Sequence, residues 1–326
     1  MKFDLLGIGD TVTDAFIRLE EAKVKGEGND RELCLRFADK IPYEEVYVVP
    51  AVGNSANAVV AASRLGLKSA LVTNIGDDAE GRQCLKKFRT EDVSARFVKS
   101  HRGKKTNYHY VLWYGDERTI LIKHYLYDYA LPRIDSPRWI YLSSLGENSL
   151  PLHDTLAEYL VAHPEIKLAF QPGTFQIKFG KERLQKIYER SEIFFCNKEE
   201  AERILGLPQT EIKTLLKAVS ALGPKIVVIT DGPAGAYALH EGQAWKMPSY
   251  PDPKPPYERT GAGDAFSATL TSALALGLSF QDALRWGPIN SMAVVQEVGA
   301  QAGLLSREKL EDYLRQAPTD YIPQKI

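Results

Sequence analysis

A short run near the carboxyl end of the chain places a carboxylate and small residues at the start of an apolar helix. It reads Glu258-Arg259-Thr260-Gly261-Ala262-Gly263-Asp264-Ala265-Phe266, and the residues from there to Leu276 carry no charge. We expect a buried helix whose first N–H groups, unpaired within the helix, face a cleft. The two glycines let an anion approach these N–H groups, and Asp264 adds a base. The combination predicts a phosphoryl-transfer site.

Two further segments offer polar groups to a ligand. Asp14 comes soon after Gly9 and the first predicted strand, although a lone Asp in a loop is more often a local cap. Gly53-Asn54-Ser55-Ala56-Asn57 opens a predicted helix with two amides, which can donate and accept hydrogen bonds with a polyhydroxylated ligand. Capping of the helix by Asn54 or Ser55 is the structural alternative. Capping does not account for Asn57.

Residues after two later strands are candidates for contact with a nucleotide. Asn197 and Glu200 have the spacing of a capping box, which is the structural alternative for them. In the functional interpretation they lie near a nucleotide phosphate and its magnesium ion, which prefers oxygen ligands. Thr230-Asp231-Gly232 ends an apolar strand and is equally compatible with a simple hairpin turn.

The elements that must position these residues alternate between strands and amphipathic helices. The expected strands are 3–8, 69–75, 139–143, 166–170, 192–196 and 225–230, and the expected helices are 55–66, 81–91, 152–163, 198–205 and 212–222. This order predicts an α/β fold with a mostly parallel sheet covered on both faces. Ligands then collect at the carboxyl ends of the strands.

Two segments interrupt the alternation and have antiparallel character. Residues 32–37 alternate between apolar and polar side chains, with 16–25 as a weaker strand candidate, and residues 107–125 predict a hairpin around the turn Gly115-Asp116-Glu117-Arg118. We expect lid segments at about 15–49 and 98–130, inserted in a single domain that spans residues 1–326. A structural edge or a dimer surface is an equal alternative for any single strand.

Composition and motif content argue against several classes of function. The 326 residues carry a formal net charge of −1, which gives no support for a nucleic-acid or membrane partner. The three cysteines form no close pair, and no apolar run reaches the roughly 20 residues of a membrane span, so we expect a soluble cytoplasmic protein. Metal-ligand histidine spacing, a Gly-x-Ser-x-Gly elbow and a P-loop are all missing from the sequence.

Taken in order, these elements resemble the PfkB or ribokinase family of carbohydrate and nucleoside kinases over nearly the whole chain. Thr260-Gly261-Ala262-Gly263-Asp264 fits the family's carboxy-terminal signature, Asp-Thr-x-Gly-Ala-Gly-Asp. Val52-Gly53-Asn54-Ser55-Ala56-Asn57 corresponds to its amino-terminal Gly-Gly-Asn-x-x-Asn. The resemblance implies a ribokinase-like three-layer αβα sandwich with a small antiparallel β lid, and ATP and Mg²⁺ as cofactors.

The resemblance also implies a role for each matching residue. Asp264 corresponds to the catalytic general base, and Gly261, Ala262 and Gly263 supply the anion hole. The residues implied to contact the sugar are Asp14, Gly53, Asn54 and Asn57. The residues implied to serve the nucleotide are Asn197, Glu200, Thr230, Gly232 and Asn290, with Glu200 reaching the metal through water.

The chain departs from the family pattern at two places. Glu258-Arg259 replaces the usual Asp-Thr in a region that helps hold a monovalent cation in relatives, which argues against activation by K⁺. Val52 replaces the first glycine of the amino-terminal pair and would narrow the floor of the substrate site.

The expected reaction moves the γ-phosphate of ATP to a hydroxymethyl group of a small sugar of the ribose, fructose or ketose type. A nucleoside is the second acceptor class because of the aromatic lid. A phosphosugar, bound by Arg102, Lys104 and Lys105, is the third. The alternative outside enzymology is a catalytically silent relative that binds a nucleotide as a regulatory module. A homodimer formed through the lid is a further expectation.

Overall fold

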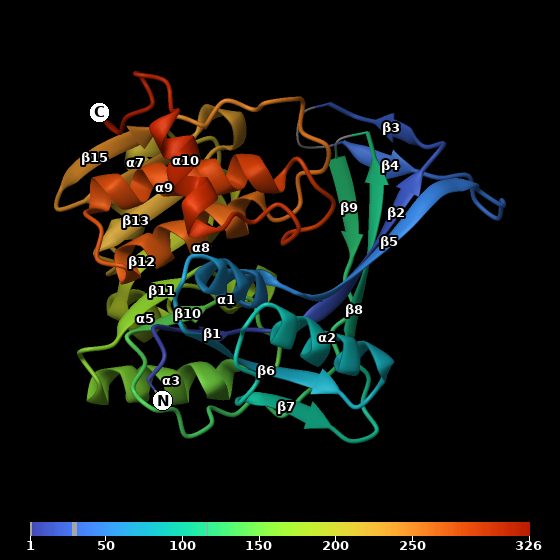
Figure 1. The fold of residues 1–326 in the computed structure, drawn as a ribbon, viewed down its shortest axis with the longest axis horizontal. Coiled ribbons are helices and arrows are strands. Elements are labelled where there is room, and N and C mark those ends of the chain that lie inside the picture. The colour runs from blue at the N-terminus through green and yellow to red at the C-terminus, as the bar shows by residue number, and fades with distance from the viewer. Residues whose placement is uncertain (1, 28–30, 116) are drawn as a thin grey trace.

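A ten-stranded sheet runs through the centre of the computed structural model, which describes residues 2–27, 31–115 and 117–326 (Figure 1). In spatial order its strands are β16 (Gln324–Lys325), β15 (Gln243–Met247), β14 (Ala236–His240), β13 (Ile226–Thr230), β12 (Ser191–Asn197), β11 (Lys167–Phe170), β10 (Trp139–Leu142), β1 (Leu5–Ile8), β6 (Ser69–Gly76) and β7 (Val98–His101). All pairs from β13 to β7 are parallel, and the pairs from β13 to β16 are antiparallel. The expected mostly parallel sheet is confirmed.

Helices cover both faces of this sheet. The helices on one face are α1 (Asn54–Arg64), α2 (Ala79–Thr90), α8 (Ala262–Ala275), α9 (Phe280–Val294) and α10 (Arg307–Arg315). Those on the other are α3 (Leu150–Ala162), α4 (Thr174–Phe179), α5 (Gln185–Arg190), α6 (Lys198–Leu205) and α7 (Ile212–Ser220). Because strand side chains alternate, Leu5 packs in the first layer and Leu6 in the second. The three-layer αβα sandwich follows from this double burial.

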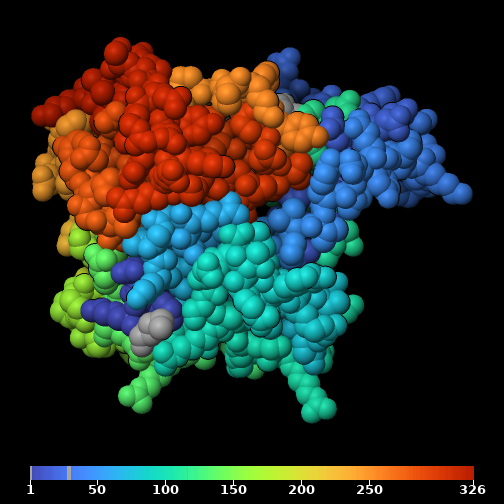
Figure 2. All heavy atoms as spheres, viewed as in Figure 1, coloured from blue at the N-terminus to red at the C-terminus, as the bar shows by residue number. Residues whose placement is uncertain are grey.

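A four-stranded sheet projects from the body of the molecule, as Figures 1 and 2 show. Its spatial order is β5 (Tyr43–Val52), β2 (Val12–Leu19), β8 (Asn107–Tyr114) and β9 (Glu117–Leu121). The β2–β5 and β8–β9 pairs are antiparallel, whereas β2 and β8 run parallel. The predicted lid sheet is therefore present, with one parallel pair at its centre. Asp116 of the predicted hairpin turn lies outside the described residues.

The lid differs from the sequence expectation in three places. The predicted strand 32–37 is only β4 (Glu32–Cys34), which pairs with β3 (Lys23–Lys25) outside the lid sheet, and Phe37 is fully exposed. The long strand β5 escaped prediction because Glu44, Glu45 and Pro50 interrupt its apolar alternation. Strand β7 pairs with β6 in the central sheet, so the second lid segment begins after His101.

No helix in the described ranges is long and apolar enough to cross a membrane.

An ion-pair cluster ties α1 to α2 and to the chain after α9. Glu91 accepts hydrogen bonds from Arg64 Nε at 2.9 Å and from Lys87 Nζ at 2.6 Å. Arg64 Nη1 donates to the carbonyls of Gln301 and Leu304. The hydrogen bonds from Arg64, helped by Lys87 and opposed by burial, lower the pKa of Glu91 to about 2.

We predict that Glu91→Gln removes a contribution to stability that depends on pH. Because the folded pKa lies below the unfolded value of about 4.3, this contribution is present above that value and is lost as the pH falls toward 2. The pKa shift of Glu91 corresponds to about 3 kcal/mol in the free energy of unfolding. Solvent screening of this partly exposed group reduces the expected contribution to about 1–2 kcal/mol. Urea unfolding of both proteins between pH 7 and pH 3 should show the difference shrinking. A difference that stays constant would contradict the prediction.

Candidate active site

Two neighbouring cavities open at the carboxyl ends of the parallel strands. The first, here called the Asp264 cavity, has a volume of about 440 Å³, and the second, the Tyr250 cavity, about 530 Å³. The strand ends supply to the first cavity Asp10 after β1, Ser144 after β10, Gln171 after β11, Asn197 at the end of β12 and Thr230 at the end of β13. Both cavities are lined by Thr230, Arg259, Ala262 and Gly263. The position at the strand ends is the one expected for an α/β ligand site.

The loop that opens α8 lies between the two cavities. Gly261 caps the helix with a φ of 85°, in the left-handed region, and a Cβ atom there would lie 2.3 Å from Ala300 Cβ. Ala265 N–H donates to Gly261 O at 2.8 Å and closes the first turn. Ala262 N–H makes a long bond of 3.5 Å to Arg259 O, whereas the N–H groups of Gly263 and Asp264 have no carbonyl to reach inside the helix, so they and the helix dipole can hold an anion. The helix begins at Ala262, so Asp264 lies within its first turn.

Glu258, which precedes this loop in the chain, stabilises it through hydrogen bonds. Its carboxylate is fully buried and accepts hydrogen bonds from Thr260 N at 2.8 Å and from Thr260 Oγ1 at 2.6 Å. Burial raises the pKa of Glu258, and the bonds from Thr260 oppose that rise. Glu258, which replaces the Asp of the pattern that the sequence resembles, thus holds the loop through hydrogen bonds.

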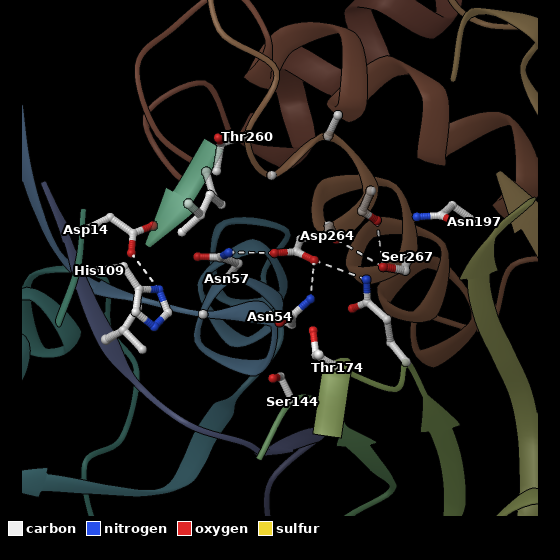
Figure 3. Close-up of a pocket in the computed structure, with 18 of the residues that line it drawn as sticks. Asp14, Asn54, Asn57, His109, Ser144, Thr174, Asn197, Thr260, Asp264 and Ser267 are labelled. Carbon is white, nitrogen blue, oxygen red and sulfur yellow. Dashed lines mark hydrogen bonds and ion pairs between the residues drawn. The ribbon is translucent and has the colours of Figure 1, made fainter. Parts of the chain in front are cut away.

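Three side-chain amides surround the Asp264 carboxylate. Asn54 Nδ2 and Gln171 Nε2 donate to Oδ1 at 2.8 and 3.0 Å, and Asn57 Nδ2 donates to Oδ2 at 2.8 Å. Figure 3 shows Asn54 and Asn57 pointing at Asp264 from α1. Desolvation raises the pKa of Asp264, while the amide hydrogen bonds lower it. A carboxylate with these partners at a cavity wall can serve as a general base.

Asp14 lies within β2 and not in a loop after β1, and both Asp14 and Gly53 line the Asp264 cavity. Asp14 Oδ1 is 3.3 Å from Nδ1 of His109, and both residues line the cavity (Figure 3). Gly53 has a φ of 118°, and a Cβ there would meet Asp10 O at 2.5 Å. The glycine is therefore required for the close approach of the chain at the entrance to α1.

Helix α1 has no side-chain cap, which excludes the structural alternative for its first residues. Its N-cap is Gly53, and Ser55 Oγ donates instead to Ile8 O at 2.8 Å and lies 2.6 Å from Ser143 Oγ. Ser55 thus fastens the helix to the central sheet. The side-chain amides of Asn54 and Asn57 donate to Asp264 and do not cap the helix.

Asn197 and Glu200 form the capping box that the spacing allows, and they also line the Asp264 cavity. Glu200 N–H donates to Asn197 Oδ1 at 2.8 Å, and Asn197 N–H donates to Glu200 Oε2 at 2.9 Å. Burial raises the pKa of Glu200, and the bond from Asn197 opposes the rise. The structural and functional interpretations are compatible for this pair.

The donor set around Glu200 fits a magnesium ion that is held mainly by its substrate. Among the described residues, no group of three or more His, Cys, Asp or Glu side chains could hold a metal ion. Mg²⁺ commonly uses one or two carboxylates together with substrate phosphates and retained waters. Glu200, at the cavity wall with one oxygen engaged by Asn197, suits that mode.

Of the other three residues expected to serve the nucleotide, two line the Tyr250 cavity. Thr230 and Gly232 line it, together with Phe266 and Met292. Asn290 does not: it is fully buried, its Nδ2 donates to Thr269 Oγ1 at 2.8 Å, and its Oδ1 accepts from Leu305 N. The predicted role of Asn290 in nucleotide binding is therefore replaced by a structural one that joins α8, α9 and the following chain.

The positive charges at the cavities are not the ones the sequence singled out. Arg102, Lys104 and Lys105 line neither cavity, and Lys104 Nζ donates to Leu126 O at 2.6 Å. Arg118 of β9 and Arg259 line the Asp264 cavity instead. The cationic groups that line the Asp264 cavity thus come from the lid and from the loop before α8, and both lie within 4.0 Å of the Glu117 carboxylate.

The lid packs against the segment that leads into the α8 loop. Arg18 Nη1 of β2 donates to the Tyr257 hydroxyl at 2.8 Å, and the rings of Trp113 and Tyr257 meet edge to face with centroids 5.0 Å apart. Arg259 Nε is 4.0 Å from Glu117 Oε1 of β9. The lid sheet is therefore in direct contact with the segment that leads into the α8 loop.

Several cavity residues were missed by the sequence reasoning. Asp10 accepts hydrogen bonds from the Tyr129 hydroxyl at 2.9 Å and lies 3.0 Å from His124 Nδ1. His109 and Gln171 were missed as well. The positions of Asp10 and Gln171 directly after predicted strands were a usable signal, because parallel strands end at one edge. The two histidines reach the cavity from the lid, and no local pattern marks them.

Comparison with known proteins identifies the family to which the chain is similar. Residues 28–307 match the model of the pfkB family carbohydrate kinases. Ribokinase from Bacillus subtilis is 28% identical over 270 residues, which cover 80% of this chain and 87% of the relative. A nucleoside kinase from Methanothermobacter thermautotrophicus is 24% identical over 308 residues, with 92% of each chain covered.

Solved structures of the same fold include ligand complexes. Ribokinase from Arabidopsis thaliana with ribose and ATP superposes with a TM-score of 0.79 at 19% identity, covering 97% of this chain and 99% of that one. A putative ribokinase II from E. coli with ATP and Mg²⁺ gives a TM-score of 0.74 at 16% identity, covering 97% and 100%. At these identities the likeness concerns the fold.

Proposed function

From the premise that the chain belongs to the pfkB family of carbohydrate kinases, we propose that it moves the γ-phosphate of ATP to a hydroxymethyl group of a small sugar of the ribose, fructose or ketose type. The observation that carries this proposal is the position of Asp264. Its carboxylate lies in the first turn of α8, next to the residues that line both cavities. A base at the boundary of two sites is what transfer between two substrates requires.

In the proposed reaction the sugar occupies the Asp264 cavity, where Asp14, Gly53, Asn54 and Asn57 orient it. ATP occupies the Tyr250 cavity with its phosphates directed toward the α8 loop. Asp264 accepts the proton of the hydroxymethyl group as that oxygen attacks the γ-phosphorus, and the bond from phosphorus to the ADP oxygen breaks. The N–H groups of Gly261, Ala262 and Gly263 stabilise the charge that develops on the transferred group, where losing one such donor typically costs about 3 kcal/mol.

Magnesium, when bound with the nucleotide, would neutralise phosphate charge. Glu200 would hold it through water, and Asn197 fixes the Glu200 carboxylate in place. Arg259 lines both cavities and supplies a positive charge of the protein's own. The lid strands would exclude water over the reacting groups, which limits hydrolysis of ATP.

Two other acceptor classes have a specific observation in their favour. Ile120, Ile122 and Phe175 form an apolar wall of the Asp264 cavity that a nucleobase could contact, which favours a nucleoside. Arg118 offers a positive charge from the lid, which favours a phosphosugar. The catalytically silent alternative has no need of a base, so the amide-bound Asp264 speaks against it.

The test is a transfer screen with the purified protein and Mg-ATP. D-ribose, D-fructose and other ketoses are compared with adenosine and fructose 6-phosphate, and both ADP formation and the mass of the phosphorylated product are measured. Transfer to a sugar supports the proposal, and faster transfer to adenosine or to fructose 6-phosphate replaces its acceptor class. ATP binding by calorimetry without transfer to any compound would favour the regulatory module.

We predict that Glu200→Gln raises the Mg²⁺ concentration needed for half-maximal rate by about tenfold, because removing a partner in a metal's outer shell typically has an effect of about 10- to 100-fold. Gln is also accepted at this position of a capping box, so α6 should keep its cap. Rates are measured against Mg²⁺ at fixed ATP. Glu199→Gln, the exposed neighbour, is the matched control. An equal dependence of the rate on Mg²⁺ in both variants would contradict a role of Glu200 in holding the metal.

We also propose a homodimer through the outer face of the lid. Strand register puts Val48, Ala15, Tyr110 and Leu121 in one row across the lid sheet. Three of them are large and about half exposed, Val48 at 57%, Tyr110 at 49% and Leu121 at 52%. An apolar sheet face of this kind is commonly covered by a partner.

We predict that Leu121→Asp converts this dimer to a monomer, because the change buries a charge at the proposed interface. Light scattering coupled to size-exclusion chromatography measures the mass. Val161→Asp, on α3 at 66% exposure, is the control that should leave the mass unchanged. A wild-type protein that is monomeric at tens of micromolar would contradict the proposal.

A further inference from the structure

Two side chains that line neither cavity fix the orientation of the amides around Asp264. The first is Tyr141 of β10, which is fully buried. Its hydroxyl donates to Gln171 Oε1 at 2.7 Å and lies 2.8 Å from Ser267 Oγ. Burial and the nearby Asp264 carboxylate raise the pKa of Tyr141 well above its usual value, so the hydroxyl keeps its proton. With Oε1 engaged in this way, the Nε2 group of Gln171 is turned toward Asp264.

The second is Gln301, which follows α9 and is 1% exposed. Its Nε2 donates to Ala51 O at 2.7 Å and to Asn57 Oδ1 at 3.0 Å. The carbonyl of Ala51 can only accept, so it fixes which end of the Gln301 amide carries the donors. Asn57 Oδ1 is thereby engaged, and its Nδ2 group faces Asp264 Oδ2.

We propose that Tyr141 and Gln301 are positioning residues for the base: they hold the amides of Gln171 and Asn57 with N–H toward Asp264, and they leave one acceptor position on Oδ2 for the proton of the acceptor hydroxyl. This inference rests on the proposed role of Asp264. Each carboxylate oxygen has about two lone-pair positions. Oδ1 is filled by Asn54 and Gln171, whereas Oδ2 accepts only from Asn57 among the described residues.

The orientation matters because an amide that turns over presents its oxygen to the carboxylate. Contact between two acceptors would disfavour the charged form of Asp264 and would therefore raise its pKa. Other charged groups lining the cavity are Asp14 of β2, Glu200 of α6, Arg118 of β9 and Arg259, with His109 and His124 from the lid segment and Asp10 after β1. None of these is altered when Tyr141 or Gln301 is substituted, so a shift can be assigned to the amides.

The experiment follows the ionisation of Asp264 by carbon NMR of the full chain labelled at aspartate carboxyls, with the resonance assigned by its loss in Asp264→Asn. Tyr141→Phe and Gln301→Met are each expected to raise the pKa of Asp264 by about one unit, the size of one lost hydrogen bond to a charged group. The dependence of kcat on pH is measured with the best acceptor of the screen. The apparent pKa of its acidic limb should rise by the same amount, and the KM for ATP should stay unchanged.

A double-mutant cycle separates positioning from general loss of stability. Gln301→Met should add little in an Asn57→Leu background, and Tyr141→Phe little in a Gln171→Leu background, because each acts through its amide. Thr269→Val is the matched control, since it removes a buried hydroxyl on α8 that accepts from Asn290 and from none of the amides around Asp264. It should lower stability without moving the pKa of Asp264.

An unchanged Asp264 pKa in Tyr141→Phe and Gln301→Met overturns the inference, as does a shift of equal size in the Thr269→Val control or in the backgrounds that lack the amides. Should Gln301→Met fail to fold, Tyr141→Phe, which removes a single oxygen, decides the question alone. The NMR measurement needs no turnover. It therefore reports on the amides even if Asp264→Asn proves active and the proposed function fails.

Discussion

Asp264→Asn is expected to lower kcat by about 10²- to 10⁴-fold, the range typical for removal of a general base. The amide that replaces the carboxylate cannot take the proton of the acceptor hydroxyl at neutral pH. It also places an NH₂ group opposite either Asn57 or the pair Asn54 and Gln171, so the amides that face it must reorient. The measurement is the steady-state rate with the best acceptor of the transfer screen.

Nucleotide binding provides the control for this variant. Removal of a negative charge beside the phosphate site should leave ATP affinity equal or slightly tighter, since like charges repel. Calorimetric titration with ATP and a thermal unfolding curve would show that the protein is folded and binds. Near-normal kinase activity in a folded Asp264→Asn protein would remove Asp264 from the role of base.

The part of the site that could be predicted from the sequence is the part built from local geometry. Gly261, Gly263 and Asp264 are adjacent, and the uncharged run behind them predicts a buried helix. The buried helix is present as α8, and Gly261 takes a left-handed conformation at its start. The capping box of Asn197 and Glu200 is local for the same reason.

The partners of Asp264 depend on contacts across the whole chain, and few of them could be predicted. Gln171 lies 93 residues away in sequence from Asp264, and Gln301 lies 244 residues from Asn57. No periodicity marks a residue whose role is to orient another side chain. Asn290 shows the limit of such a prediction: α9 does line the Tyr250 cavity through Pro288, Ser291 and Met292, but the Asn290 amide is bonded inside the protein.

The fold itself follows the alternation of apolar runs wherever both faces of a strand are buried. The central strands β6, β10 and β11 agree with the prediction to within about a residue or two at each end. The lid was harder to predict because its strands are half exposed. Charges and a proline in β5 hide the alternation, and the pairing of β2 with β8 joins residues that are 95 positions apart in the sequence.

The second large effect is expected from alanine substitutions at Gly261 and Gly263. Both should lower activity, but for different physical reasons. Gly261→Ala should lower kcat/KM by about 10²- to 10³-fold, comparable to loss of an anion-hole donor, and should also destabilise the protein. Its new Cβ would lie 2.3 Å from Ala300 Cβ and 2.5 Å from Ala300 Cα, at a φ of 85°. The left-handed conformation alone costs about 1–2 kcal/mol for alanine, and the clash forces the loop to move.

Gly263→Ala should fold with wild-type stability, since nothing lies within 4 Å of its new Cβ. The methyl group points into open space where Gly263 lines both cavities, on the path that we propose for the transferred phosphoryl group. We expect a loss in kcat of at least about tenfold, because small misplacements of reacting groups have large effects on rate. Thermal unfolding and kinetics of the two variants measure both quantities.

The double variant Gly261→Ala with Ala300→Gly decides between the two causes of the Gly261 effect. It removes the contact with Ala300 Cβ but keeps the approach to Ala300 Cα and the positive φ. Recovery should therefore be partial in stability and small in rate. Full recovery would mean that crowding alone fixes the loop, and equal loss of stability in Gly261→Ala and Gly263→Ala would show that the loop is not held in the conformation described.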